Sequence, residues 1–185
     1  MISHTHKFIF IHNNKTGGTS ISKSLINKTI PECKHCTILE HKKKYGDYFD
    51  SYFKFTIVRN PWDRLVSQYF FRVGDDSQFG FVPRKKNTSF REFLQRPFPI
   101  GHVQQFSRIS NKNGNVLIDF IGKFENLQQD FNIVCDKLGI PQQQLPHEYK
   151  TKHKHYTEYY DEETKQIVAE KYAKDIEYFG YEFGG

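Results

Sequence analysis

The feature that most constrains the fold is an apolar run that meets a glycine pair and then a helical pattern, FIFIHNNKTGGTSISKSL, from Phe8 to Leu25. The apolar residues predict a strand over 7–12, and the hydroxyl-rich stretch after the glycines predicts a helix over 19–28. Paired glycines let backbone N–H groups approach an anion, and the positive end of the helix points to the same place. This stretch therefore predicts an anion-binding loop, with an ordinary glycine turn as the alternative.

The position of the lysine separates this loop from the P-loop of nucleoside-triphosphate enzymes. In the P-loop pattern G-x-x-x-x-G-K-[ST] the lysine follows the last glycine, whereas Lys15 precedes both Gly17 and Gly18. Lys15 adds a full positive charge to the loop. Three hydroxyl side chains around the glycines add hydrogen-bond donors: Thr16, Thr19 and Ser20.

Strand and helix patterns alternate along the chain. Two further β-rich runs predict strands over 53–59 and 116–122. A helix follows each of them, the later one ending at Gly139, and a last helix begins at Asp161. This alternation predicts an α/β fold, a P-loop-like three-layer arrangement with a central parallel sheet flanked by helices. We expect one domain over residues 1–185.

A second group of candidate ligand residues follows the strand over 53–59. The Asn-Pro dipeptide there suits the cap and first position of a helix, so Arg59 leaves the strand end and Ser67 lies on the helix. The Arg59 guanidinium can hold a phosphate through two charge-assisted hydrogen bonds, each worth about 1.5–3 kcal/mol. The alternative is a structural ion-pair network of Arg59, Asp63 and Arg64, which is the interpretation that we favour for Arg64.

Charge and hydropathy restrict the class of partner and the location of the protein, but less sharply than the motifs do. The formal charge of +6 favours an anionic partner such as a nucleotide, an acidic glycan, a nucleic acid or a membrane surface. No stretch approaches the roughly 20 apolar residues of a membrane span, and the N-terminal apolar run is too short for a secretory signal. The chain is therefore expected to be soluble and cytoplasmic, with no transmembrane segment.

The cysteines suggest neither a disulfide framework nor a complete zinc site. There are three, and Cys33 and Cys36 form a C-x-x-C pair. A closed structural zinc site needs four ligands, usually from two spaced pairs. No second C-x-x-C exists, although His35, His41 and the His153/His155 pair could contribute. Free thiols and the absence of a metal are therefore the expectation.

Together the two phosphate-binding stretches resemble the sulfotransferase family that uses 3′-phosphoadenosine 5′-phosphosulfate (PAPS). FIHNNKTGGTSI is similar to the loop that grips the 5′-phosphosulfate, usually written I-P-K-T-G-G-T-S, and VRNPWDRLVSQY is similar to the segment that grips the 3′-phosphate. FIGKFENLQQDF and the stretch from LPHEYKTKHKHY to IEYFGYEF are similar to the family's C-terminal half. The resemblance is strongest to bacterial-type members and heparan sulfate uronosyl sulfotransferases. Asn14 departs from it, since the family usually has proline there.

The resemblance implies a role for each matching position. Lys15 would contact the phosphosulfate and neutralise charge on the bridging oxygen as the S–O bond breaks. Arg59 and Ser67 would hold the 3′-phosphate, and Lys152 lies in a segment that would close over the nucleotide. The 5′-phosphate would be cradled by the remaining residues of the first loop: Thr16, Gly17, Gly18, Thr19 and Ser20.

Transfer of a sulfuryl group also needs a base for the acceptor hydroxyl. A histidine with an ordinary pKa of about 6.5 is largely neutral near pH 7 and basic enough to help, whereas a carboxyl group with a pKa of about 4.3 is weaker. This favours His35 or His41 over Glu40. The family often carries His-x-T between its two PAPS motifs, and H-C-T at His35 matches it, so His35 is the preferred candidate.

The expected function is a PAPS-dependent sulfotransferase that works by in-line displacement without a metal. The resemblance points to a hydroxyl on a glycan or polysaccharide as acceptor, with no nucleic acid partner. One alternative is a P-loop kinase or NTPase, which needs a lysine after the glycines and an acidic metal ligand at a strand end. The other is a non-enzymatic basic module that binds anionic polymers through its lysine clusters. Neither alternative explains two phosphate-gripping motifs in one chain.

Overall fold

The computed structural model of the chain describes five stretches: 1–26, 35–73, 88–95, 103–146 and 153–185. The chain forms two compact units, the first from Met1–Arg59 and Ile100–Glu148 and the second from Asn60–Pro99 and Tyr149–Gly185. The glycine-rich loop and Arg59 therefore belong to the same unit. The single domain expected over residues 1–185 stays a prediction.

A four-stranded sheet in the order β1-β2-β3-β4 forms the centre of the first unit. Its strands are β1 (Ile2–Ser3), β2 (Phe8–Ile11), β3 (Phe53–Val58) and β4 (Phe120–Lys123). β2, β3 and β4 run parallel, and β1 pairs with β2 in the antiparallel direction. The predicted α/β class with a mostly parallel central sheet is confirmed, and β1 was not predicted.

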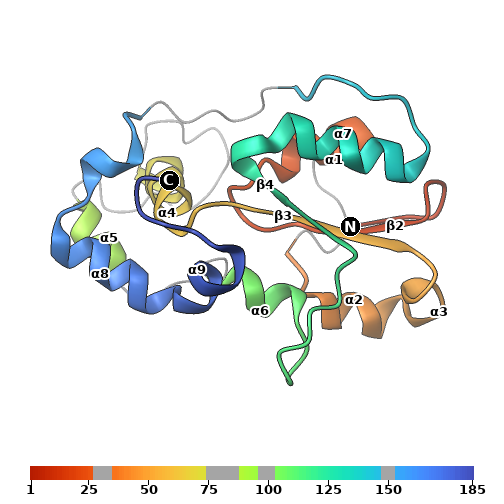
Figure 1. Cartoon of the computed structure of the whole chain (residues 1–185), viewed down its shortest axis with the longest axis horizontal. Helices are drawn as coiled ribbons and strands as arrows, with labels where there is room; N and C mark the ends of the chain where they lie inside the picture. The colour runs from red at the N-terminus through yellow and green to blue at the C-terminus, as the bar shows by residue number, and fades with distance from the viewer. Residues whose placement is uncertain (27–34, 74–87, 96–102, 147–152) are drawn as a thin grey trace. The chain divides into compact units, whose positions relative to one another are not determined.

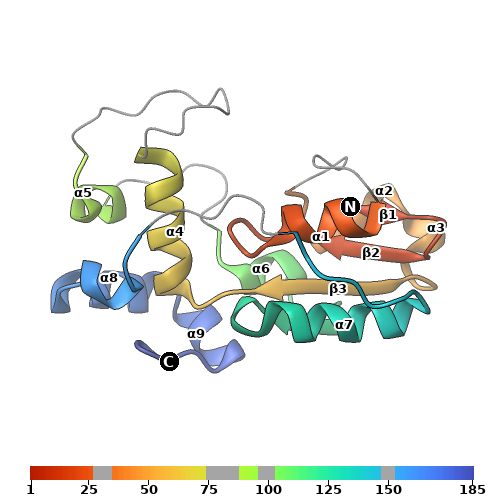
Figure 2. The ribbon, with the colours of Figure 1, turned by 90° about the horizontal axis from the view of Figure 1, so that it is seen from above.

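Helices cover both faces of this sheet (Figure 1). α1 and α7 lie on one face, and α2, α3 and α6 lie on the other. Seen from above, α1 lies on the β2 side of β3 and α7 lies on the opposite side (Figure 2). Their bounds are α1 Gly18–Ile26, α2 Ile38–Lys44, α3 Gly46–Phe49, α6 Gln105–Ile109 and α7 Leu127–Leu138, the last preceded by the 3₁₀ turn η2 Phe124–Asn126.

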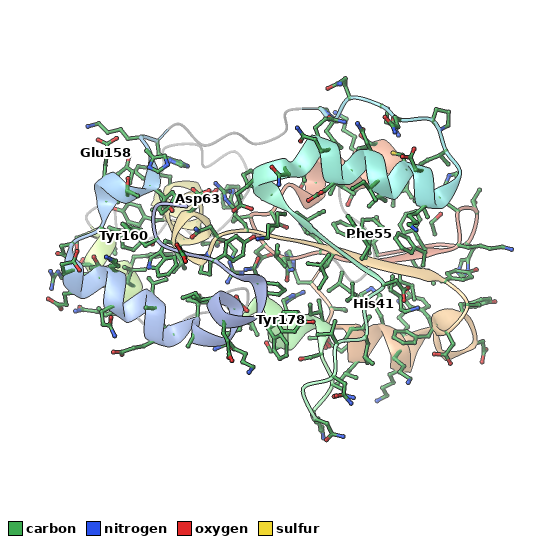
Figure 3. The ribbon with its side chains drawn as sticks, viewed as in Figure 1. His41, Phe55, Asp63, Glu158, Tyr160 and Tyr178 are labelled. Carbon is green, nitrogen blue, oxygen red and sulfur yellow. The ribbon has the colours of Figure 1, made fainter. Side chains whose placement is uncertain are left out.

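Alternation of side chains along the strands gives each face its own buried layer. On the α1 and α7 face the rings of Phe10 and Phe55 stack with their centroids 4.7 Å apart. Figure 3 shows Phe55 on this face and His41, from α2, on the other. The α1 and α7 layer is an aromatic and aliphatic cluster: Phe8, Phe10, Ile21, Leu25, Phe55, Ile57, Phe131, Val134 and Cys135. The parallel register of β2 and β3 thus holds the loop after β2 beside the end of β3.

The strand predicted over 116–122 is wrong at its start. Val116 instead forms an isolated antiparallel bridge with Ser110. β4 begins only at Phe120, after Asp119 has joined β3: the Asp119 N–H donates to the Lys54 carbonyl at 2.8 Å, and the Asp119 carboxylate accepts the Lys54 N–H at 2.7 Å. The chain therefore folds back on α6 before it enters the sheet.

The second unit is helical and aromatic-rich. It contains α4 (Pro61–Val73), α5 (Phe90–Gln95), α8 (Glu162–Lys171), α9 (Ala173–Phe179) and the 3₁₀ turn η3 (Tyr156–Tyr159). Its core is a cluster of buried apolar side chains: Trp62, Leu65, Val66, Phe93, Leu94, Tyr156, Val168 and Tyr172. The predicted last helix does begin after Asp161, but it is two helices, because the chain leaves helical geometry at Tyr172.

A local contact caps the start of α4, and a long-range contact holds one of its side chains. The Asn60 side-chain oxygen accepts the Trp62 N–H at 3.1 Å, which confirms the predicted N-cap. Arg64 forms a structural ion pair with Asp175, at 3.9 Å. Within the described ranges, no helix has the length and apolarity that a membrane crossing requires.

Candidate functional site

The glycine-rich loop between β2 and α1 has an unusual backbone. Lys15 has a φ of +63° and Gly17 a φ of +76°, so two residues that flank Thr16 lie in the left-handed region. That region costs a non-glycine residue about 1–2 kcal/mol. Left-handed residues in a turn create concave arrays of N–H groups that bind anions. The conformation of Lys15 therefore favours an anion-binding loop over an ordinary glycine turn.

Both glycines also lie against neighbouring side chains, and Gly17 has in addition the left-handed backbone that favours glycine. A Cβ atom on Gly17 would lie 2.6 Å from Cδ2 of Leu127, the first residue of α7. A Cβ atom on Gly18 would lie 2.1 Å from Cδ2 of His12. The sequence suggested that the glycines clear the approach of an anion, but in the structure they also make room for His12 and Leu127.

Buried hydrogen bonds hold the loop to the neighbouring strand. The Asn13 side-chain amide donates to Thr56 Oγ1 at 3.0 Å and to the Ile57 carbonyl at 3.1 Å, both on β3. The Thr16 hydroxyl donates to the Asn13 carbonyl at 2.9 Å, so it supports the loop from inside. Thr19 and Ser20 lie in the first turn of α1, where Thr19 is half-buried and Ser20 is buried.

Arg59 joins the two predicted phosphate motifs. It follows β3, and its Nη1 atom donates to the Lys15 carbonyl at 3.0 Å across 44 residues of sequence. The guanidinium also lies over the ring of Phe124, with its carbon 4.0 Å from the ring centroid. Arginine can stack on a ring and still present the N–H donors in the plane of its own guanidinium. The strand ends thus bring Lys15 and Arg59 into direct contact.

Sequence reasoning missed the residue that fixes the backbone of Arg59. Gln105, on α6, is fully buried, and its side-chain oxygen accepts the Arg59 N–H at 2.9 Å. Its side-chain nitrogen donates to the Arg59 carbonyl, also at 2.9 Å. The Gln105 side-chain amide therefore makes the two hydrogen bonds to the Arg59 backbone that a neighbouring strand would make. No local pattern marks a glutamine for such a role.

The preferred base, His35, lies beside His12, and His12 packs against the first residue of α1. The His12 and His35 rings have their centroids 5.3 Å apart, and His12 in turn lies against Gly18. His35 is exposed, whereas His12 is buried. Arg108, a second residue that the sequence did not suggest, donates to the carbonyls of His12 and Cys36 at 3.3 Å each. These contacts connect the segment that carries His35 to the end of β2.

The other candidate bases are poorly suited to the task. His41 is fully buried, with Nδ1 3.0 Å from the Thr37 carbonyl and Nε2 2.8 Å from the amino nitrogen of Met1. Burial lowers the pKa of His41 to about 4. The Glu40 carboxylate accepts the Thr37 N–H in a helix cap, which lowers its pKa and makes it a weaker base. These two pKa shifts disfavour His41 and Glu40, and His35, which is exposed, stays the preferred candidate.

Ser67 and Lys152 are the two remaining predicted ligand residues. Ser67 belongs to the second unit, where it is buried on α4. Lys152 lies outside the described residues. Their roles toward a ligand stay predictions from the family resemblance.

The cysteines differ from expectation. Cys36 is disulfide-bonded, so the expectation of free thiols is wrong for this residue. Cys135 is a free thiol buried in the α7 layer, and burial raises its pKa. In the part of the chain that the structure describes, no three His, Cys, Asp or Glu side chains lie close enough to hold a metal ion.

Comparison with known proteins places the chain in a family. The sequence model described as the sulfotransferase family matches residues 1–182. The chain belongs to the sulfotransferase family. This confirms the family resemblance that the two stretches carry.

Three relatives of this sulfotransferase-family chain are informative. Carbohydrate sulfotransferase 9 of Homo sapiens is 26% identical over 187 residues, which cover 86% of this chain and 41% of that protein. Carbohydrate sulfotransferase 14 of Danio rerio is 27% identical over 161 residues, 70% of this chain and 44% of that protein. An uncharacterized protein of Archaeoglobus fulgidus is 36% identical over 97 residues, 51% of this chain and 74% of that protein. The chain thus spans about two fifths of the length of the two carbohydrate sulfotransferases. No solved structure matches it significantly.

Proposed function

We propose that this chain transfers the sulfuryl group of PAPS to a hydroxyl group on a carbohydrate. The observation that carries the proposal is the hydrogen bond from Arg59 to the Lys15 carbonyl, which joins two candidate phosphate-binding groups in one unit. The names of two relatives, both carbohydrate sulfotransferases, support a carbohydrate acceptor.

The residues of the loop fit the chemistry of the donor. PAPS carries a phosphosulfate on its 5′ side and a phosphate on its 3′ side, and when bound it supplies an activated sulfuryl group. Lys15 and the N-terminal turn of α1 offer positive charge and N–H donors to the first group. Arg59 offers a planar fork to the second. Both ends of the nucleotide thus find a cationic side chain whose backbone is fixed.

Each residue has a specific task in this proposal. Lys15 neutralises the negative charge that grows on the leaving oxygen. The loop holds the 5′-phosphate through the backbone of Thr16, Gly17 and Gly18 and through the hydroxyls of Thr19 and Ser20. Arg59 binds the 3′-phosphate. Ser67 and Lys152 stay candidates for the same nucleotide, on the family resemblance.

His35 is the proposed base. As the acceptor oxygen attacks sulfur, its proton passes to a neutral His35 imidazole, and the S–O bond to the nucleotide phosphate breaks on the opposite side. General base catalysis by such a residue contributes about 10²–10⁴-fold to a rate. The exposed position of His35 beside His12 supports this assignment.

The alternative functions fit the site less well. Thr19 stands where a P-loop has its lysine, and Arg59 follows β3, where a kinase would carry an acidic metal ligand. A basic module that binds polymers through its lysine clusters would not need Arg59 joined to the lysine of the glycine-rich loop. Sulfuryl transfer from PAPS would use both residues.

The proposal is tested by transfer of radiolabelled sulfuryl from PAPS to a panel of carbohydrate acceptors. Lys15→Ala should abolish turnover without changing the unfolding midpoint, whereas Lys43→Ala, at an exposed position on α2, should leave both unchanged. His35→Asn should lower kcat by about 10²–10⁴-fold with little effect on the affinity for the spent nucleotide. Full activity of Lys15→Ala would reject the assignment, and so would equal losses in the two lysine variants.

A further inference from the structure

Arg59 is held from two directions by residues that have no assigned role. Gln105 pairs with both polar groups of the Arg59 backbone, each at 2.9 Å, from a fully buried position on α6. Phe124, directly after β4, provides the ring on which the guanidinium rests, 4.0 Å from its centroid. One residue thus fixes the backbone of Arg59, and the other fixes the plane of its side chain.

The two contacts act on different degrees of freedom. An arginine side chain has several rotatable bonds, and ordering them on binding reduces affinity. A ring beneath the guanidinium restricts its plane, and a paired backbone keeps the side chain from moving with the end of the strand. A guanidinium held in this way binds a phosphate without first being ordered. The bond to the Lys15 carbonyl adds a third restraint in the same plane of donors.

We propose that Gln105 and Phe124 are positioning residues that hold the Arg59 fork for a 3′-phosphate, and that they thereby set the preference of the site for 3′-phosphorylated adenine nucleotides. This inference rests on the proposed function, because it assumes that Arg59 meets the 3′-phosphate. It assigns nucleotide selectivity to two residues that need not touch the nucleotide.

The test measures that selectivity directly by titration calorimetry. The probes are adenosine 3′,5′-bisphosphate and adenosine 5′-monophosphate, which differ only in the 3′-phosphate. The ratio of their dissociation constants isolates the contribution of that phosphate, and a general loss of structure weakens both ligands alike. For the wild-type chain we expect the bisphosphate to bind about tenfold to a hundredfold more tightly, the range of one charge-assisted hydrogen bond worth about 1.5–3 kcal/mol.

Four variants are compared with the wild type. Gln105→Met removes both hydrogen bonds at similar volume, and Phe124→Leu removes the ring but keeps an apolar side chain. Each should reduce the ratio by about tenfold, within the range expected for a lost cation–π contact or a lost backbone pair. Phe124→Tyr keeps the ring and should keep the ratio. Gln166→Met makes the same chemical change as Gln105→Met, but at an exposed position on α8, and it should also keep the ratio.

The outcomes separate this inference from the function on which it rests. A wild-type chain that binds both probes equally would overturn the assignment of Arg59, and the inference with it. If the wild type prefers the bisphosphate and Phe124→Leu and Gln105→Met keep the same preference, the inference about these two residues is overturned. The assignment of Arg59 then still stands. If Gln105→Met does not fold, the Leu and Tyr variants at position 124 still decide the outcome.

Discussion

A methyl group at position 18 has no room beside His12. An ideal Cβ atom there would lie 2.1 Å from Cδ2 and 2.3 Å from Nε2 of the ring, well inside the about 3.5–4.0 Å of a normal carbon contact. His12 is 4% exposed, so its ring cannot swing freely into solvent. Gly18→Ala must therefore displace a buried ring or the first turn of α1.

The magnitude follows from two opposed terms. Replacing glycine by alanine in a helix stabilises it by up to about 1 kcal/mol, whereas overpacking a buried site costs about 1–3 kcal/mol. Since the overlap exceeds 1 Å, measured from the 2.1 Å contact, we expect the second term to dominate, with a net loss of about 1–2 kcal/mol. In a chain of this size that loss lowers the midpoint of thermal unfolding by roughly 2–8 °C.

A double-mutant cycle with His12→Ala, followed by urea denaturation, separates the two terms. Without the ring, Gly18→Ala should be neutral or stabilising by up to about 1 kcal/mol. Gly46→Ala is the matched control, because it also opens a helix and a Cβ atom there would meet nothing within 4 Å. The reasoning is refuted if Gly18→Ala is as stable as Gly46→Ala while His12 is present.

The remaining predictions concern two buried ionisable side chains. Arg64→Met removes the guanidinium that lies 3.9 Å from the carboxylate of the fully buried Asp175, and it should cost about 3–5 kcal/mol in urea denaturation. Lys174→Met, which removes an exposed ion pair, should cost under about 1 kcal/mol, and equal costs would contradict the assignment of the buried pair. Because burial lowers the pKa of His41 to about 4 from an ordinary pKa of about 6.5, the unfolded chain takes up its proton first as the pH falls between these values. Stability should therefore fall across that window by at most about 3 kcal/mol. His41→Leu should flatten this dependence of stability on pH, and His155→Leu, at an exposed position, should not. If stability changes with pH equally in the two variants, the assignment to His41 is wrong.

Local sequence patterns predicted the boundary of a helix correctly where residues at that boundary set it. α7 spans Leu127–Leu138 and ends at Gly139, whose φ of +65° is the left-handed cap that the sequence predicted. α4 begins at Pro61 because Asn60 caps it through its own side chain. These signals lie within a few residues of the boundary that they set.

Long-range contacts decided what the patterns missed. β1 has only two residues, too few for any alternation to be read, and it exists because it pairs with β2. The start of β4 is set by the contacts of Asp119 with Lys54, 65 residues away. Gln105 acts on Arg59 across 46 residues, and a glutamine in a predicted helix carries no sign of such a partner. The candidate site was therefore predictable in its charged groups and not in the residues that hold them.

The proposal that Lys15 and Arg59 grip one 3′-phosphorylated nucleotide is tested most directly by thermal unfolding with added ligand. At a ligand concentration 100 times its dissociation constant, a nucleotide that binds only the folded chain adds about 2.7 kcal/mol, which raises the unfolding midpoint by roughly 5–11 °C. We predict this rise with 3′-phosphoadenosine 5′-phosphate and a far smaller one with ATP and Mg²⁺ at the same concentration. Equal stabilisation by the two nucleotides would contradict a PAPS site built on Lys15 and Arg59.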